Sequence, residues 1–389
     1  MELQSKLPDV GTTIFTIMSR LAVEHKAINL SQGFPDFETD PTLILAVSEA
    51  MAQGHNQYAP MPGLPDLNLA IAHKLHADYG WMPDPDTEIT VTAGGTQALY
   101  SIIGAMISQG DEVIVLEPSY DSYIPSVVSF GGVVKTVQLQ PPLYKVDWDE
   151  VESLITSRTK LIMINTPHNP CGVVLEQSDL KRLEEIVLKH GVYLISDEVY
   201  EHIIFDGHQH QSVLRYPELY RRSFVVFSFG KSLHVTGWKT GYVIAPPELT
   251  RELRKIHQFN VFSVNRPVQQ GTAYYITHYA NFAALSGFYQ DKRDLFLKLM
   301  QGLPLKFLPC YGSYFILADY SAVSDLDDRS FAKQLTIEGG VATIPLSPFY
   351  RNGSDEKIIR FCFAKKEDTL IEAADRLRKY FGSLPPFAP

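Results

Sequence analysis

Cysteine is scarce in this chain of 389 residues: only Cys171, Cys310 and Cys362 occur, far apart and odd in number. Without a CxxC pair, they favour neither a disulfide framework nor a zinc site, and they fit a reducing compartment. Long apolar runs are also missing. No stretch of about eighteen apolar residues occurs and the N-terminus does not read as a signal peptide, so we expect a soluble, cytoplasmic protein without a membrane span.

Positive charge is in deficit as well. Lys and Arg together number 34 against 44 Asp and Glu, which gives a formal net charge of −10. Binding to nucleic acid or to an anionic membrane needs clustered positive charge, so the sequence argues against both partners, although it allows a local basic pocket. Hydrophobic residues make up 45% and charged residues 20% of the chain, which excludes a disordered, collagen-like or coiled-coil protein.

Common nucleotide and metal motifs are absent from the sequence. Gly230-Lys231-Ser232 resembles the end of a P-loop, but Val225 stands where that motif requires glycine. No dinucleotide glycine fingerprint follows an expected strand, and no HExxH motif occurs. We therefore expect no metal site.

Short apolar runs alternate with helical patterns through the middle of the chain. The helical pattern over residues 178–190 has Ser178 as its expected N-cap and Gly191 as its expected end. The runs show little alternation of period two, as is typical of strands buried on both faces. This order predicts an α/β fold with a mostly parallel sheet. The expected strands are residues 89–92, 112–116, 161–165, 192–196, 224–228 and 242–245.

The two ends of the chain have a different pattern. Residues 1–45 are rich in loops, and after about residue 285 helices alternate with apolar runs at 313–317 and 358–363. We therefore expect a large domain over residues 46–284 and a small α+β domain that combines residues 1–45 with residues 285–389.

Four polar motifs each follow an expected strand: residues 92–99, 165–172, 197–200 and 228–231. Taken alone, each has an ordinary explanation, such as a tight turn, a helix cap or a surface lysine; the loop at 165–172 also allows a cis Asn169–Pro170 bond. Because the carboxyl ends of parallel strands share one edge, we expect the four motifs to converge. Together they offer a phosphate cradle, a carboxylate for a pyridinium nitrogen, Tyr and Asn for a phenolate, and a lysine for an aldehyde. These groups match pyridoxal 5′-phosphate.

With residues 29–37, 57–59, 117–123, 237–241 and 359–364, the motifs resemble those of the fold-type I pyridoxal-phosphate aminotransferases of class I/II. The resemblance spans nearly the whole chain, in family order and at family spacing. Within the family the chain is most similar to methionine aminotransferases and to the kynurenine aminotransferase, or glutamine transaminase K, branch. The resemblance implies a large cofactor-binding domain, a small second domain and a homodimer.

The resemblance also implies a role for each site residue. Lys231, Asp197 and Tyr200 would be catalytic: Lys231 would hold the cofactor covalently and shuttle a proton, Asp197 would pair with the pyridine nitrogen, and Tyr200 would bond the phenolate. The remaining cofactor ligands would be Gly95, Thr96, Ser228 and Lys239 at the phosphate, Tyr120 on the ring, Asn169 at the phenolate, and Tyr58 of the partner subunit. The substrate would be held by Arg360, Gly33, Asn169 and Phe15.

The sequence departs from the family pattern at two positions. Lys239 stands where many relatives carry arginine, and a lysine offers a point charge instead of a planar fork, which would loosen the grip on a phosphate. His234 stands where a small residue is common, and its role stays open.

The resemblance predicts transfer of the amino group of a neutral L-amino acid to a 2-oxo acid, in a ping-pong reaction through a pyridoxamine form. Methionine is the first expectation, with aromatic amino acids, glutamine or kynurenine as alternatives. A cysteine-S-conjugate β-lyase would use the same residues and is a second hypothesis. A third is a non-catalytic cofactor-sensing domain, as in some transcription regulators; intact Lys231 and Arg360 argue against it, and so does the short segment before the large domain.

Overall fold

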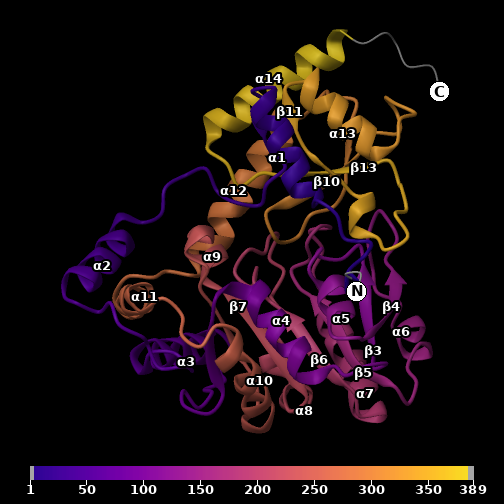
Figure 1. Cartoon of the computed structure of the whole chain (residues 1–389). Coiled ribbons are helices and arrows are strands. Elements are labelled where there is room, and N and C mark those ends of the chain that lie inside the picture. The colour runs from indigo at the N-terminus through magenta and orange to yellow at the C-terminus, as the bar shows by residue number, and fades with distance from the viewer. Residues whose placement is uncertain (1–3, 384–389) are drawn as a thin grey trace.

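A seven-stranded sheet forms the centre of the structure, a computed structural model that describes residues 4–383 (Figure 1). The strand order is β2-β8-β7-β6-β5-β3-β4, and every neighbouring pair is parallel except the two that β8 makes. The predicted α/β fold with a mostly parallel sheet is therefore confirmed. The strands are β2 (Ile89–Thr92), β3 (Glu112–Glu117), β4 (Val133–Gln138), β5 (Thr159–Asn165), β6 (Tyr193–Asp197), β7 (Ser223–Ser228) and β8 (Gly241–Ile244).

Both faces of this sheet are buried beneath helices. Along β3, Val113 and Val115 join one apolar cluster while Ile114 and Leu116 join the other, because successive side chains point to opposite faces. This two-sided burial explains the continuous apolar runs of the sequence. One face is covered by α4 (Gly94–Met106), α5 (Tyr123–Ser129) and α10 (Pro247–Asn260), and the other by α6 (Trp148–Ser153), α7 (Gln177–His190), η1 (Val213–Arg215) and α8 (Pro217–Tyr220).

Two details of the sheet and its helices differ from the sequence predictions. Strand β4 was not predicted, because it is an edge strand whose polar residues Lys135 and Thr136 are only half-buried and break the apolar run. Ser178 is not the N-cap of α7. Glu176 caps this helix, and its backbone N–H donates to the Asp179 carboxylate at 2.8 Å in a capping box. The predicted end at Gly191 is confirmed, with a left-handed φ of 67°.

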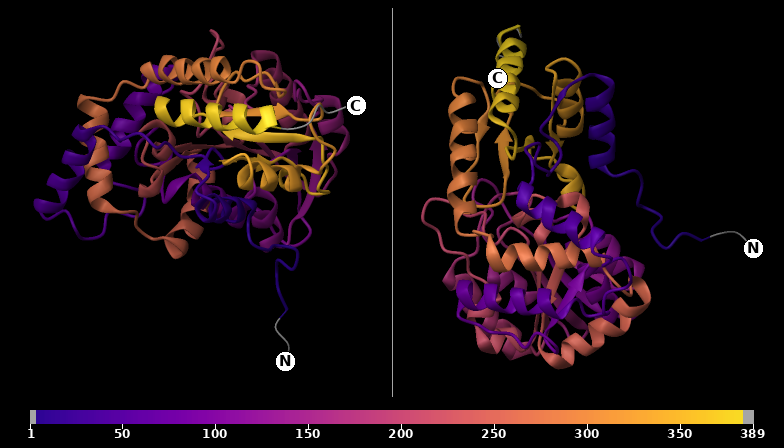
Figure 2. Two further views of the ribbon diagram at one scale, coloured as in Figure 1. Left: turned by 90° about the horizontal axis from the view of Figure 1, so that it is seen from above. Right: turned by 90° about the vertical axis from the view of Figure 1, so that its left-hand side faces the viewer.

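A smaller, antiparallel sheet lies above the edge of the large one (Figures 1 and 2). Its order is β12-β13-β10-β9, from β9 (Lys306–Phe307), β10 (Phe315–Asp319), β12 (Ile344–Pro345) and β13 (Ile358–Cys362). The N-terminal segment lies beside it in a separate two-stranded parallel sheet, in which β1 (Ile28–Asn29) pairs with β11 (Val341–Ala342), and the Cys362 N–H of β13 donates to the Leu30 carbonyl at 2.8 Å. The helices of this part are α1 (Ile14–Glu24), α12 (Ala284–Leu299), α13 (Asp328–Ile337), η3 (Ser347–Phe349) and α14 (Glu367–Ser383).

The first 45 residues contain more helix than the sequence predicted. Helix α1 begins after Thr13, whose side chain accepts the Thr16 backbone N–H at 3.3 Å. Residue 45 lies inside α2 (Pro41–Ala52), which packs against α11 (Arg266–His278); α11 also contacts α3 (Pro65–Tyr79). We therefore propose that the small domain ends in the loop before α2 and resumes near α12. Within residues 4–383, no helix combines the length and apolar character needed to cross a bilayer.

A buried ion pair ties α3 to the segment that follows β6. Lys74 Nζ lies 2.7 Å from a Glu201 carboxylate oxygen and 3.0 Å from one of Asp78, and the side chains of Lys74 and Glu201 are almost fully buried. The Tyr79 hydroxyl also donates to Glu201. Since Glu201 directly follows Tyr200, this network anchors the turn that presents Tyr200 to the sheet edge.

We predict that Lys74→Met lowers the free energy of unfolding by about 3–5 kcal/mol, because it leaves the Glu201 carboxylate buried without its cation. Lys255→Met is the matched control, since Lys255 pairs with Glu252 on the exposed surface of α10 and such pairs contribute at most about 1 kcal/mol. Chemical denaturation of both variants measures the difference. Equal stability of the two variants would contradict a structural role for the Lys74–Glu201 pair.

Candidate active site

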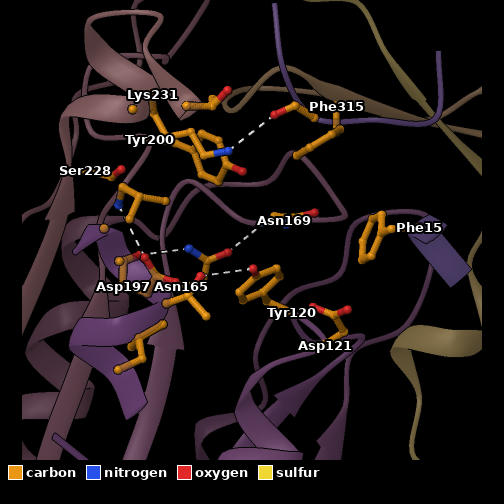
Figure 3. A pocket seen from close by; sticks show the side chains of 18 of the residues that line it. Phe15, Tyr120, Asp121, Asn165, Asn169, Asp197, Tyr200, Ser228, Lys231 and Phe315 are labelled. Atoms are coloured by element: carbon orange, nitrogen blue, oxygen red, sulfur yellow. Dashed lines mark hydrogen bonds between the residues drawn. The ribbon is translucent and has the colours of Figure 1, made fainter. Parts of the chain in front are cut away.

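The polar loops that follow the parallel strands meet at one edge of the large sheet, facing the small sheet (Figure 3). They line a cavity of about 330 Å³, a size suited to a small ligand. All site residues predicted from the sequence except Tyr58 line this cavity: Phe15, Gly33, Gly95, Thr96, Tyr120, Asn169, Asp197, Tyr200, Ser228, Lys231, Lys239 and Arg360.

One end of the cavity is built to receive an anion. Helix α4 begins at Gly94, and Gly94, Gly95 and Thr96 of its first turn line the cavity. The free backbone N–H groups and the helix dipole of a first turn favour an anion. A Cβ atom on Gly94 would lie 3.3 Å from Lys239 Nζ, so the ammonium sits against this turn. Ser228 adds a hydroxyl from the end of β7. Backbone donors, hydroxyls and one cation together suit a phosphate.

A buried carboxylate lies at the end of β6. Asp197 accepts the Tyr123 hydroxyl at 2.6 Å and the Val199 backbone N–H at 3.4 Å. Burial raises the pKa of Asp197 to about 6, and the Tyr123 hydrogen bond opposes that rise. Such a carboxylate is suited to accept a hydrogen bond from a cationic ring nitrogen.

Two asparagines organise the loop after β5. Asn165 donates its side-chain N–H to the Asp197 carbonyl at 2.8 Å and accepts the Asn169 backbone N–H at 2.7 Å. The Asn169–Pro170 bond is cis, which the sequence had allowed. Nearby, the buried Tyr200 ring packs edge-on against Tyr314 at 5.2 Å, and burial raises the pKa of Tyr200 well above its usual range. Asn169 and Tyr200 can therefore both present neutral hydrogen-bonding groups to a ligand oxygen.

The Lys231 side chain lines the cavity and extends from the short helix α9 (Phe229–Ser232), which follows β7. Its Nζ donates to the Tyr314 hydroxyl oxygen at 2.8 Å and to the Gly33 carbonyl at 3.3 Å. Withdrawal from water lowers the pKa of Lys231 to about 8, and the positive charge of Lys239 adds to this effect. A usable fraction of neutral amine is therefore present near physiological pH, as a nucleophilic lysine requires.

The Arg360 guanidinium is fully buried without an acidic partner. It donates to Asn169 Oδ1 at 2.7 Å and to the Ser31 carbonyl at 3.0 Å, and it lies 3.8 Å from the Phe315 ring centroid. Among residues 4–383, no carboxylate lies within salt-bridge distance of it, and its Nε has no hydrogen-bond partner. Burial lowers the pKa of Arg360 to about 10, so it stays charged at neutral pH. A buried, unpaired guanidinium is a ready receptor for the carboxylate of a ligand.

The structure adds site residues to which the sequence analysis gave no role. Tyr123, Asn165 and Tyr314 contact Asp197, Asn169 and Lys231 respectively. Asp121 and Phe315 line the cavity (Figure 3). Asp121 and Tyr123 belong to the motif at residues 117–123, and Asn165 is the last residue of a predicted strand, so their positions in the sequence could have indicated a role in the site. For Tyr314 and Phe315, in an apolar run, no chemical signal was present.

Two residues that the sequence analysis singled out, Tyr58 and His234, do not line the cavity. Tyr58 is 78% exposed and packs edge-on against Phe262, with ring centroids 5.3 Å apart, so it does not reach the cavity of its own chain. His234 has a left-handed φ of 58° and packs edge-on against Phe37 at 4.9 Å. Burial lowers the pKa of His234 to about 4, which makes it a neutral member of an aromatic cluster.

Taken together, the donor set fits pyridoxal 5′-phosphate. One cavity contains the three groups that this cofactor requires: an anion site, the buried Asp197 carboxylate and the Lys231 amine. At the anion site, Lys239 Nζ lies so close to Gly94 that a side chain there would crowd it. Asp197 and Asp121 are the acidic residues of the described lining, which contains no histidine or cysteine that could join them as metal ligands.

Comparison with known proteins gives the same answer. Residues 25–377 match the family described as Aminotransferase class I and II, whose members use pyridoxal 5′-phosphate to act on amino acids and oxo acids. The chain is 52% identical over 377 residues to the methionine aminotransferase of Escherichia coli strain K12, covering 97% of this chain and 98% of that protein. It is 34% identical to kynurenine–oxoglutarate transaminase 1 of Homo sapiens, with coverages of 93% and 94%.

A solved structure, that of YbdL from Escherichia coli, superposes with a TM-score of 0.95 at 51% identity, covering 97% of this chain and 100% of the other. That work identifies a methionine aminotransferase function for YbdL. The family match covers most of the chain, and the fold-type I architecture agrees with it. This chain therefore belongs to the class I and II aminotransferases, and it is a transaminase.

Proposed function

We propose that this enzyme binds pyridoxal 5′-phosphate and transfers the amino group of a neutral L-amino acid, with L-methionine as its preferred donor, to a 2-oxo acid. The observation that carries this proposal is the buried Arg360 guanidinium, which lacks an acidic partner among the described residues and shares one cavity with Lys231 and Asp197. The 52% identity to a methionine aminotransferase supports the choice of donor.

The proposed cofactor contacts follow from the donor set. Gly95, Thr96, Ser228 and Lys239 would bind the phosphate, Tyr120 would stack on the ring, and Asn169 and Tyr200 would hydrogen-bond the phenolate oxygen. When bound, the cofactor supplies an electrophilic carbon that takes up the amino group and a ring that withdraws electrons. Asp197 would hold the proton on the ring nitrogen, because its buried carboxylate is stabilised by Tyr123 and Val199.

Lys231 would be the covalent anchor and the general acid and base. Its pKa of about 8 leaves both the neutral and the charged form available near neutral pH, which suits a group that takes a proton from the substrate Cα and delivers it again. Arg360 would hold the α-carboxylate in a fork, with Gly33 and Asn169 at its side, and so place Cα beside Lys231 Nζ.

The preference for a neutral side chain is supported by the charges of the cavity. Its described lining contains three cations, Lys231, Lys239 and Arg360, and each already has a proposed task. Asp121 adds an acidic side chain to the lining, and in its ionised form this carboxylate would repel an acidic substrate side chain nearby. The rings of Phe15 and Phe349, edge-on at 5.8 Å, offer apolar surface next to Arg360.

We further propose that the enzyme is a cytoplasmic homodimer in which Tyr58 of the partner subunit completes the phosphate site. Tyr58 and Phe259 are 78% and 86% exposed, an unusual exposure for aromatic side chains and typical of a surface that a partner covers. The three free, buried cysteines agree with a reducing compartment.

We expect sedimentation equilibrium to give twice the chain mass of 43.7 kDa. We also expect Tyr58→Phe to weaken the retention of pyridoxal phosphate about tenfold, since a phosphate loses one charge-assisted hydrogen bond. Phe262→Leu, which alters the same exposed pair without a polar atom, is the control. A monomeric mass would contradict the homodimer. Cofactor retention by Tyr58→Phe equal to that of the wild type would contradict the role of Tyr58 at the phosphate.

The donor is tested by the near-ultraviolet and visible spectrum of the purified enzyme. We expect a yellow chromophore bound through Lys231 that converts to the pyridoxamine form when L-methionine is added without an oxo acid. Lys231→Ala should fold normally but lose turnover. Conversion by another amino acid and not by methionine would replace the donor, and the absence of any chromophore after reconstitution would refute the cofactor.

Arg360→Lys tests the receptor for the substrate carboxylate. This variant keeps a positive charge but loses the planar fork, so we expect kcat/KM for L-methionine to fall about 10- to 100-fold while the spectrum of the bound cofactor stays the same. Arg221→Lys, a change at a surface ion pair, is the matched control. Unchanged steady-state kinetics in Arg360→Lys would assign the carboxylate to another residue.

A further inference from the structure

Tyr314 links the Lys231 amine to the loop at Gly33. The Tyr314 hydroxyl donates to the Gly33 carbonyl at 2.6 Å, and Lys231 Nζ lies 2.8 Å from the same hydroxyl oxygen. Lys231 Nζ is also 3.3 Å from the Gly33 carbonyl, so the three polar groups form a closed triangle. Tyr314 has no role in the functions described above.

The single proton of the Tyr314 hydroxyl determines the direction of these hydrogen bonds. A phenol carries a single proton, and Tyr314 donates it to the Gly33 carbonyl, so toward Lys231 the hydroxyl oxygen can only accept. Burial raises the pKa of Tyr314 well above its usual range, which keeps the phenol neutral near physiological pH. Tyr314 therefore acts as a fixed, neutral acceptor for an N–H of Lys231, not as a base.

The position of Tyr314 is tightly constrained. Its side chain is fully buried, its ring packs against Tyr200 at 5.2 Å and Phe315 at 4.9 Å, and its carbonyl accepts the Phe363 N–H at 3.1 Å. Gly33 is constrained as well, because a Cβ there would lie 2.5 Å from a Phe315 ring atom. The acceptor and the loop it binds are therefore pre-organised around Lys231 Nζ.

We propose that Tyr314 is a positioning residue that holds the ε-amino group of Lys231 whenever this group is not bonded to the cofactor. This inference rests on the proposed function, in which Lys231 both anchors the cofactor and shuttles the substrate proton. A lysine released from a covalent bond has a long, flexible stem, and a fixed acceptor keeps its nitrogen within reach of Cα. Because Tyr314 also holds the Gly33 loop, the amine and the proposed carboxylate site share one support.

Several groups around Lys231 influence its protonation besides Tyr314. Burial and the positive charges of Lys239 and Arg360 disfavour the ammonium, while Asp197 and the Cys362 sulfur favour it. The Tyr314 oxygen favours the charged form by hydrogen bonding, at a site where the described residues place no carboxylate in contact with Lys231 Nζ. Removal of this oxygen should therefore change a measurable property of Lys231 itself.

The first test compares Tyr314→Phe with Tyr289→Phe. Tyr289 is a matched control: it is fully buried, its ring lies 5.8 Å from that of Tyr314, and its hydroxyl has no hydrogen-bond partner among the described residues. The rate of Lys231 acetylation by acetic anhydride is followed against pH by peptide mass spectrometry, on the full-length chain freed of cofactor. This rate rises with pH as the amine loses its proton, so its midpoint reports the pKa of Lys231.

We expect a midpoint near 8 in the wild type and in Tyr289→Phe, and a midpoint about one unit lower in Tyr314→Phe, because the ammonium loses one acceptor. Site-specific 3-fluorotyrosine at position 314 keeps the ring and weakens the acceptor, so it should give a smaller shift in the same direction even if Tyr314→Phe folds poorly. Equal midpoints in all these proteins would overturn the proposal.

The second test uses the cofactor-loaded enzyme. We expect the single-turnover conversion by L-methionine to slow about 10- to 100-fold in Tyr314→Phe, with the dissociation constant for the donor unchanged, and to stay normal in Tyr289→Phe. An unchanged rate in Tyr314→Phe would also overturn the proposal. A failure of the proposed function is distinguishable, since it would appear as a wild type without a Lys231-bound chromophore, whereas the acetylation midpoints need no cofactor.

Discussion

The arrangement of this enzyme depends on the hydrogen bonds that the buried Arg360 guanidinium donates. It extends from β13 of the small sheet, donates to Asn169 in the loop after β5 of the large sheet, and donates to the Ser31 carbonyl in the N-terminal segment. One side chain thus joins three segments that lie more than a hundred residues apart in the sequence. Neutral acceptors and aromatic rings stabilise the buried guanidinium, so its positive charge stays available to the carboxylate of a ligand.

The same withdrawal from water tunes the other ionisable groups of the cavity. It lowers the pKa of Lys231 toward 8 and raises that of Asp197 toward 6, so the lysine gains a neutral fraction while the acid stays mainly ionised at neutral pH. Each of these two groups is hydrogen-bonded to a neutral tyrosine hydroxyl: Tyr123 donates to Asp197, and Tyr314 accepts from Lys231. Opposite hydrogen-bond polarities at two phenols thus support opposite charges.

Much of the architecture could be predicted from the sequence, because strands buried on both faces leave continuous apolar runs and their carboxyl ends carry the polar motifs. Prediction failed where the local pattern is weak or shared. The edge strand β4 is half polar, the capping box at Glu176 competes with Ser178, and α1 and α2 lie in a segment rich in loop-forming residues. The half-buried edge strand β4 depends on its pairing with β3, whereas the caps of α1 and α7 are local hydrogen bonds for which the sequence offers competing candidates.

The sequence by itself determined which chemical groups stand at the strand ends, namely Lys231, Asp197, Asn169 and the Gly94–Gly95 turn, and these local patterns were enough to indicate the family. Only the tertiary structure decided that Arg360 reaches Asn169, that Tyr123 supports Asp197 and that Tyr314 holds Lys231. The physical reason is that a pattern of neighbours along the chain encodes local conformation and burial. Hydrogen bonds between residues 74 to 191 positions apart exist only after the elements that carry the two partners have packed together.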